Sequence, residues 1–318
     1  MRLKIHLLTI LVSVLTVLSF YLVITDPTPR SELQGHLVQF VQGVPVRAET
    51  AAFILPISEP TFFPIRDTAV PVPELTVKSF LVYDTKNEKV IFSKEPGRVL
   101  PVASLTKLLT AIIGIDFLEP QEVITISNDS YNVDGEGADF RLQEQFYFKD
   151  LLGAMLVKSS NDAALAIAKT LEQKTGENFV GLMNRRARQI GMTESRFIDP
   201  AGLGDDGFST ARDLLRLARY SKNYPEVWHL LGLRSLDINA VDGKLTHHFE
   251  STNKLWASMP NLKGGKTGYT DGALGCMILE EDLPEQDSSL IIIVLGSADR
   301  FGEVKKLSDW SKLAFRWR

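Results

Sequence analysis

The chain has 318 residues, of which 44% are hydrophobic and 23% are charged, and its formal net charge is -4 at pH 7. This composition is typical of a folded protein that buries a substantial core, and it excludes a disordered chain. No basic excess indicates nucleic-acid binding, so no nucleic-acid partner is expected.

Neither cysteine nor histidine usage predicts a metal centre. The single cysteine, Cys276, excludes an internal disulfide and a multi-cysteine site. Its apolar neighbours predict a buried thiol, with a reactive thiol as the minor alternative because a chemical motif lies just upstream. The five histidines are scattered, and the adjacent His247 and His248 would point to opposite faces of a strand. No metal is therefore expected.

Residues 1–25 predict a membrane anchor. Arg2 and Lys4 precede an apolar run from about Leu7 to Ile24, interrupted only by Ser and Thr. About 20 such residues in a helix span the hydrocarbon core of a bilayer. No small-x-small motif closes the run, which favours an uncleaved signal anchor over a removed signal peptide. The leading positive charge places the short end in the cytoplasm and the remaining chain outside.

Residues 26–74 are expected to form a mostly extended spacer between the membrane and the folded domain. Eight prolines fall in this stretch, and they exclude a long helix or a central strand. The folded domain is expected to begin near Leu75. The predicted organisation is therefore an anchor over 1–25, a spacer over 26–74 and one domain over 75–318.

The domain is expected to begin with strands and to continue with helices. Phe80–Tyr83 and Lys89–Phe92 flank a polar turn and predict a β-hairpin. A helix is expected from about Ser104, because apolar residues follow it at helical spacing. Next in chain order we expect a short strand at Val123–Ser127 and helices at Lys149–Val157, Asp162–Glu172, Glu177–Ile190 and Thr210–Tyr220, the last capped by Thr210 or Ser209.

Three more strands and a helix complete the expected domain. Gly264–Thr270, Ala273–Leu279 and Leu290–Gly296 have the pattern of strands in one sheet, and the last is apolar throughout, as a buried central strand should be. A final helix is expected from about Phe301, with an apolar stripe at Val304, Leu307, Trp310, Leu313 and Trp317. The pattern predicts an α/β fold whose sheet is built from both ends of the domain.

Ser104 and Lys107 form the first candidate catalytic pair. Positions three apart share one face of a helix, so the amine can reach the hydroxyl. A serine needs an adjacent base to become a good nucleophile, and a lysine can serve once it has lost its proton. Burial and a second nearby cation both lower the pKa of a lysine from about 10.4.

Each candidate motif has a second copy, so context decides between the copies. The copies are Ser251–Lys254 for Ser-x-x-Lys, Ser221–Asn223 and Ser251–Asn253 for Ser-x-Asn, and Lys174–Gly176 for Lys-Thr-Gly. Lys174–Gly176 ends a polar helix, where Lys and Gly are ordinary stop signals. Lys266–Gly268 instead follows two glycines and leads into a strand, which permits close approach of a ligand. The coherent set is Ser104, Lys107, Ser159, Asn161 and Lys266.

The ordered trio Ser-x-x-Lys, Ser-x-Asn and Lys-Thr-Gly resembles that of the penicillin-recognising serine enzymes. The surrounding sequence is similar to the low-molecular-mass penicillin-binding proteins that are D-alanyl-D-alanine carboxypeptidases. The segments that carry this resemblance are Pro101–Ala111, Lys158–Ala164, Gly191–Leu203, Phe208–Asp213 and Gly264–Thr270. It runs from about Leu75 to the carboxyl end and implies an α+β, β-lactamase/DD-peptidase-like domain with an antiparallel sheet.

The resemblance implies catalytic roles for five residues. Ser104 would attack the carbonyl between two D-alanines, with Lys107 as base. Ser159 would relay a proton toward the leaving amine, and Asn161 would bind the substrate backbone. Lys266 would add positive field.

The same resemblance implies a substrate-binding segment at 267–269. Thr267 would help hold the terminal carboxylate, and Gly268 leads to Tyr269, whose backbone N–H would form the oxyanion hole with that of the nucleophile. Arg300 matches the family's carboxylate-side arginine, but its short spacing from the preceding strand leaves a surface charge as an equal alternative. The family's Ala-Gly pair reads Ala273-Leu274-Gly275 here, which should leave the strand intact.

The implied protein is a carboxypeptidase of the bacterial cytoplasmic membrane, single-pass, with its catalytic domain on the extracytoplasmic side. It would remove the terminal D-alanine of peptidoglycan stem peptides through an acyl-Ser104 intermediate without a cofactor, and β-lactams would inhibit it covalently. An endopeptidase acting on cross-links shares every motif and stays open. A β-lactamase is disfavoured because no Glu-x-x-Leu-Asn segment lies between Asn161 and Lys266. A catalytically silent peptidoglycan-binding protein is disfavoured because the motifs are intact.

Overall fold

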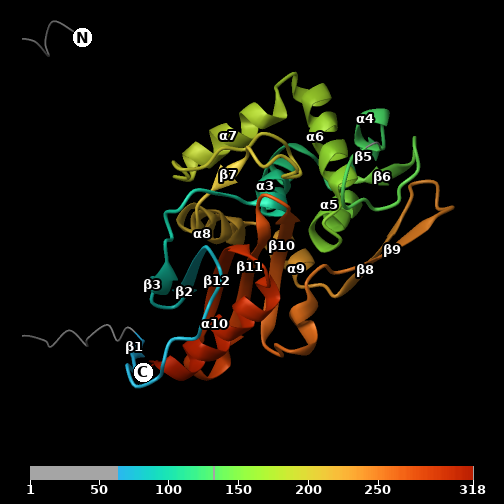
Figure 1. Cartoon of the computed structure of the whole chain (residues 1–318). Coiled ribbons are helices and arrows are strands. Elements are labelled where there is room, and N and C mark those ends of the chain that lie inside the picture. The colour runs from blue at the N-terminus through green and yellow to red at the C-terminus, as the bar shows by residue number, and fades with distance from the viewer. Residues whose placement is uncertain (1–63, 132, 318) are drawn as a thin grey trace, which may run out of the picture. The chain divides into compact units, whose positions relative to one another are not determined.

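The structure, a computed structural model, describes residues 64–131 and 133–317 (Figure 1). The predicted anchor over 1–25 lies outside these residues, and no helix in the described part is long and apolar enough to cross a membrane. The predicted spacer overlaps the described chain only at its end. There β1 (Ile65–Arg66) pairs with β13 (Phe315–Arg316), so regular pairing already occurs before Leu75.

A five-stranded antiparallel sheet joins the two ends of the domain. Its order is β10-β11-β12-β2-β3. The strands are β2 (Ser79–Asp84), β3 (Lys89–Lys94), β10 (Leu262–Thr270), β11 (Leu274–Leu283) and β12 (Ser288–Ser297). The structure therefore confirms the expected hairpin, the three later strands and the single sheet that they form. Pairing of Thr270 with Leu274 shows that the altered Ala-Leu-Gly segment leaves the strand intact.

The central strand β12 separates two apolar cores. Leu290, Ile292 and Val294 pack on the side of α10 (Arg300–Ala314), whereas Ile291 and its alternate neighbours face the helical part of the domain. Both faces of β12 are covered, which explains why this strand is apolar at every central position. Figure 1 shows α10 along the strands, with most of the other helices gathered in the upper part of the view.

The helical part is built around α3 (Lys107–Phe117), which contacts α5, α6, α7 and α8. The other helices are α4 (Asn128–Tyr131), α5 (Phe148–Val157), α6 (Asn161–Thr175), α7 (Phe179–Gln189), α8 (Ala211–Tyr220) and α9 (Pro225–Leu231). Short 3₁₀ helices occur at η1 (Ala103–Thr106), η2 (Ser221–Asn223), η3 (Lys254–Ala257) and η4 (Pro284–Gln286). All the expected helices are present, and Thr210 caps α8 by accepting a hydrogen bond from the N–H of Asp213.

Small strand pairs bind the loops between these helices. They are β4 (Leu100–Pro101) with β7 (Phe208–Ser209), β5 (Val123–Thr125) with β6 (Gln145–Tyr147), and β8 (Ser235–Asn239) with β9 (Thr246–Glu250). Helix α9 was not predicted from the sequence, although Pro225 at its first position is a common helix start. The β8–β9 hairpin, in which His247 contacts Glu144 and the exposed His248 contacts Asp237, was not predicted either.

Two further predictions concern Cys276 and the apolar stripe of the final helix, and only the first is confirmed in full. Cys276 is fully buried, and burial raises the pKa of its thiol to about 11, so the expectation of a buried, unreactive cysteine is confirmed. The apolar stripe predicted on the final helix was wrong at Leu313, which is 73% exposed, and at Trp317, which lies beyond the end of α10 at Ala314. The buried face continues from Leu307 through Trp310 to Ala314 instead, because these positions follow the helical repeat of 3.6 residues.

The difference between the two leucines of α10 predicts a difference in stability. Leu307→Ala leaves a cavity between α10 and the sheet and should lower the free energy of unfolding by about 2–5 kcal/mol. Leu313→Ala, the matched control on the same helix, should change it by less than about 0.5 kcal/mol. Denaturant unfolding followed by tryptophan fluorescence measures both. Equal losses in the two variants would contradict the buried face assigned to α10.

Candidate active site

Ser104 lies on η1, immediately before α3, and not on the α-helix that the sequence analysis placed there. The preceding residue, Ala103, has a φ of 49°, in the left-handed region that residues with a Cβ rarely adopt. This sharp bend lets Ser104 stay half-buried and accessible while Lys107 is fully buried at the start of α3. The Nζ of Lys107 is 2.9 Å from the Oγ of Ser104, so the predicted pair does meet.

Lys107 has two further hydrogen-bond acceptors. Its Nζ lies 2.6 Å from the Oδ1 of Asn161 and 2.8 Å from the carbonyl oxygen of Ala201. A neutral amine has two N–H bonds and one lone pair. If Asn161 and Ala201 accept the two N–H bonds, the lone pair is directed at the hydroxyl of Ser104. The arrangement therefore orients Lys107 to take the proton of Ser104.

Burial sets the charge state of Lys107. Removal from water lowers the pKa of Lys107 from 10.5 to about 7, while the carboxylates of Asp199, Asp162 and Glu136 act against this by raising it. A large fraction of Lys107 is therefore neutral near pH 7, as a general base requires. The sequence predicts that burial and a second cation both lower this pKa, but burial alone lowers it at Lys107.

Lys266, on β10, lies on the other side of the site. Its Nζ donates to the Oγ of Ser159 at 2.7 Å and to the carbonyl of Thr267 at 2.9 Å. Burial lowers the pKa of Lys266 well below its ordinary value, and the nearby charges of Lys107 and Arg300 lower it further. The repulsion between the two lysine cations therefore lowers the pKa of Lys266 and not that of Lys107.

Ser159 and Asn161 are held at the start of α6. Ser159 has a φ of 67°, a second left-handed residue at the site. The side-chain amide of Asn161 donates to the carbonyl of Asp134, and its backbone N–H donates to the carbonyl of Glu136, both at 2.8 Å. With the amide nitrogen engaged, the Oδ1 of Asn161 faces Lys107. Ser159 and Asn161 therefore belong to the cluster that the sequence predicted.

The edge strand β10 passes close to the nucleophile. A Cβ at Gly268 would lie 3.0 Å from the backbone nitrogen of Ser104, so glycine permits this approach. The approach brings the backbone of Gly268 and Tyr269 beside Ser104, as an oxyanion hole formed by the two chain segments requires. Thr267 is buried, and its hydroxyl is hydrogen-bonded at 2.6 Å to that of Thr252.

Arg300 lies against the wall of the site. Its guanidinium carbon is 6.0 Å from the centre of the ring of Tyr269, and its side chain packs so near Gly275 that a Cβ there would come within 3.0 Å. The Nε of Arg300 is buried without a hydrogen-bond partner among the described residues. Of the two alternatives left by the sequence, the position favours an arginine that acts at the site over a surface charge.

The second copies of the motifs have structural roles. Lys254 is exposed, and the Oγ of Ser251 accepts from the N–H of Asn253, with no hydrogen bond to Lys254. Gly176 ends α6 in the left-handed conformation, as expected of a helix stop. Ser221 donates to the carbonyl of Ala218 in the last turn of α8. The choice of copies made from context is therefore consistent with the geometry.

Sequence reasoning missed the turn that supports Lys107. The carboxylate of Asp199 accepts hydrogen bonds from consecutive backbone N–H groups, those of Ala201, Gly202, Leu203 and Gly204. This turn presents the carbonyl of Ala201 to Lys107. Asp-Pro followed by Gly is a turn signal in the sequence, but the signal does not show what the turn contacts.

Gly202 allows the same turn to pack closely against the segment that contains Ala103 and Ser104. Its φ is 76°, and a Cβ would lie 2.0 Å from the carbonyl oxygen of Ala103.

Thr252 is the other residue whose contact was missed, because it lies inside a motif copy that context set aside. Its hydrogen bond to Thr267 supports the segment expected to hold the substrate carboxylate.

Comparison with known proteins agrees with this geometry. A model of the D-alanyl-D-alanine carboxypeptidase family matches residues 66–299. The chain belongs to this family. It is thus a serine-type D-alanyl-D-alanine carboxypeptidase, a hydrolase, and the resemblance seen in the sequence is confirmed.

Three similar proteins illustrate the family. A D-alanyl-D-alanine endopeptidase of Pseudomonas aeruginosa is 32% identical over 77% of this chain and 77% of its own length. The D-alanyl-D-alanine carboxypeptidase DacC of Escherichia coli is 29% identical over 83% of this chain and 67% of its own. The solved structure of a penicillin-binding protein from Listeria monocytogenes, in its ampicillin-bound form, has a TM-score of 0.66 with 26% identity, covering 77% of this chain and 99% of that one.

The charge state of Lys107 predicts the pH dependence of acylation by the full chain. Only neutral Lys107 can accept the proton of Ser104, so the rate should rise with pH through an apparent pKa of about 7. Lys107→Ala should be at least about 100-fold slower at every pH. The measurement is the acylation rate with a fluorescent penicillin from about pH 5 to pH 10. If the wild-type acylation rate rose only near the ordinary lysine pKa of about 10.4, Lys107 would be ruled out as the base.

The turn at Asp199 predicts two separable effects. The charge of Asp199 raises the pKa of Lys107. In Asp199→Asn, which keeps an acceptor oxygen, the acylation rate should therefore rise at lower pH, and its plateau at high pH should be largely retained. Asp199→Ala also removes the acceptors that hold Ala201, so its plateau should fall by about 10- to 100-fold. The same pH series measures both variants. A full plateau in Asp199→Ala would show that the turn does not position Lys107.

Proposed function

We propose that this enzyme removes the terminal D-alanine from peptidoglycan stem peptides, with Ser104 as its nucleophile. The observation that carries the proposal is the convergence of Ser104, Lys107, Ser159 and Lys266 in one cluster of short hydrogen bonds. Only Ser104 among them is partly accessible, which suits the group that must reach the substrate.

The geometry supports a stepwise acyl transfer. As the Oγ of Ser104 attacks the carbonyl between the two D-alanines, its proton passes to Lys107. The oxyanion forms between the backbone N–H groups of Ser104 and Tyr269, and one such donor contributes about 3–4 kcal/mol in the transition state. Ser159, hydrogen-bonded to Lys266, passes a proton to the nitrogen of the departing D-alanine as the C–N bond breaks, and the proton that Lys107 took from Ser104 replaces it, so that Lys107 is neutral again. Water then hydrolyses the acyl-Ser104 ester.

The terminal carboxylate of the substrate fits the positive side of the site. Arg300 supplies positive field, Lys266 can take up a proton when a carboxylate arrives beside it, and Thr267 offers a hydroxyl on the edge strand. The buried Nε of Arg300 has no hydrogen-bond partner among the described residues, so an arriving carboxylate would be stabilised there. The same feature supports covalent inhibition by β-lactams, which carry a comparable carboxylate next to a strained amide.

Cleavage of peptide cross-links is the second candidate activity. Its support is the name of the Pseudomonas aeruginosa relative, an endopeptidase that matches 77% of this chain. The two candidates separate when the full chain is given a linear pentapeptide ending in D-Ala-D-Ala and a cross-linked dimer. Release of free D-alanine from the linear peptide supports the carboxypeptidase. Cleavage of the dimer alone would replace that proposal with the endopeptidase.

The assignment of the nucleophile predicts a contrast between two serines. Ser104→Ala should abolish penicillin labelling and peptide cleavage, because no other hydroxyl contacts Lys107 among its hydrogen-bond partners. Ser251→Ala, in the second Ser-x-x-Lys copy, should retain both activities, since Ser251 has no bond to a lysine. Gel fluorescence with a labelled penicillin, followed by peptide mapping, measures this. Near wild-type labelling of Ser104→Ala would refute the assignment.

We also propose that residues 1–25 anchor the protein in the cytoplasmic membrane, with the catalytic domain on the outer side. The support is the apolar run after Arg2 and Lys4. The full chain should remain in the membrane fraction with its original amino terminus, and a chain beginning at Asp26 should be released. Amino-terminal sequencing that begins inside the spacer would identify a cleaved signal peptide instead.

A further inference from the structure

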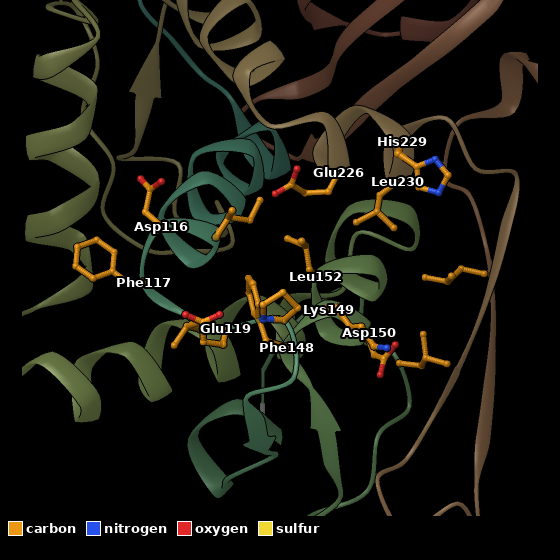
Figure 2. Close-up of a pocket in the computed structure, with 15 residues that line it drawn as sticks. Asp116, Phe117, Glu119, Phe148, Lys149, Asp150, Leu152, Glu226, His229 and Leu230 are labelled. Carbon is orange, nitrogen blue, oxygen red and sulfur yellow. The ribbon is translucent and has the colours of Figure 1, made fainter.

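A separate cavity of about 590 Å³ lies in the helical part of the domain. Its wall comes from the end of α3 and the following loop, the first turns of α5, helix α9 and strand β8. Figure 2 shows Leu152 near the middle of the view, with Glu226 above it and Lys149 and Asp150 below. The volume is within the range of sites that bind small organic molecules.

The cavity is distinct from the catalytic cluster. Lys107 begins α3, whereas the cavity is lined from Ile115 onward, so about 12 Å of helix separates them. Helix α5 also separates the cavity from the catalytic residues, because it begins at the cavity with Phe148 and ends two residues before Ser159. The cavity therefore lies at the far ends of the two helices that lead to the catalytic residues.

The floor of the cavity is apolar and preformed. Leu118, Phe148, Leu152 and Ile238 are each at most 4% exposed, so their positions are fixed by packing against the main core. Leu236 from β8 completes the surface. Such a floor would bind the hydrocarbon part of a ligand, since burying apolar area is favourable by about 25 cal/mol per Å².

The rim of the cavity carries a negative excess. Its carboxylates are Asp116, Glu119, Asp150 and Glu226, against the two basic residues Lys149 and His229. Asp116 is already paired with Arg186 and Tyr224. The side-chain carboxylates of Asp150 and Glu226 form no hydrogen bond or ion pair within the described part of the chain. The negative dipole end of α3 also borders the cavity, and the positive dipole ends of α5 and α9 oppose it, so the negative excess comes from the carboxylates themselves.

The state of Asp150 supports an incoming cation. Partial burial raises the pKa of its carboxyl group, and the charge of the neighbouring Lys149 offsets this only in part. A cation placed beside Asp150 would compensate the lost hydration, whereas a second anion would not. Charge complementarity thus selects among the ligands that the apolar floor alone would admit.

We propose that this cavity binds a small amphiphilic cation, in which an apolar body rests on the floor around Leu152 and an amine lies at the rim that carries Asp150 and Glu226. Nothing in the proposed carboxypeptidase mechanism uses these residues, so the site is independent of that function.

Three probes that differ only in their head group test the proposal on the full chain: phenylbutylamine, phenylbutanol and phenylbutyrate. Isothermal titration should show the amine binding at least about tenfold more tightly than the alcohol, with the carboxylate weakest. The double variant Asp150→Asn, Glu226→Gln should lose that advantage. Asp129→Asn, which removes an exposed carboxylate outside the cavity, is the matched control and should leave binding unchanged.

Leu152→Trp tests the position by filling the cavity. It should abolish binding of the amine while penicillin acylation of Ser104 remains intact, which shows that the variant is folded. If Leu152→Trp fails to fold, the charge variants still decide, because their side chains lie on the rim. Equal affinity for the amine and the alcohol would overturn the proposal, as would undiminished amine binding in the double variant or in folded Leu152→Trp.

Discussion

The enclosed amine of Lys107 is the interaction on which the site depends. A lysine in water is almost fully protonated near pH 7 and cannot act as a base. In this fold α3 is surrounded by other helices, and its first residue has no contact with solvent. That enclosure lowers the pKa of Lys107 to about 7, a change worth several kcal/mol that packing of the whole domain must supply. The catalytic chemistry therefore rests on the stability of the helical core.

The same enclosure requires unusual backbone around the site. Ala103 and Ser159 both adopt left-handed conformations, at a cost of order 1–3 kcal/mol each. Gly202 and Gly268 allow two chain segments to approach the loop of Ser104 more closely than any side chain would permit. These four positions cluster at the active site, where function outweighs the local preference of the chain. They bring a helix start, a turn and an edge strand to a single hydroxyl group.

Residue spacing and context were sufficient to predict the sheet, most of the helices and the catalytic cluster. They failed where a property depends on tertiary packing. The 3₁₀ turn at Ser104 and the exposed Leu313 both follow from how a helix meets its neighbours. The carbonyl of Ala201 is a backbone atom, which every residue possesses, so no residue pattern could identify it. The cavity around Leu152 likewise combines four distant elements and leaves no motif in the sequence.

The two lysines of the site have different tasks because they have different neighbours. The carboxylates of Asp199 and Glu136 limit the fall in the pKa of Lys107, so Lys107 can both release and regain a proton near pH 7. Lys266 is close to Lys107 and Arg300, and both cations disfavour its charge. A substrate carboxylate would reverse that balance by stabilising the charged form of Lys266. The negative charge of that carboxylate and the proton taken up by Lys266 would cancel, so Lys107 would keep the pKa of about 7 that burial sets and would stay available as the base when the substrate is in place.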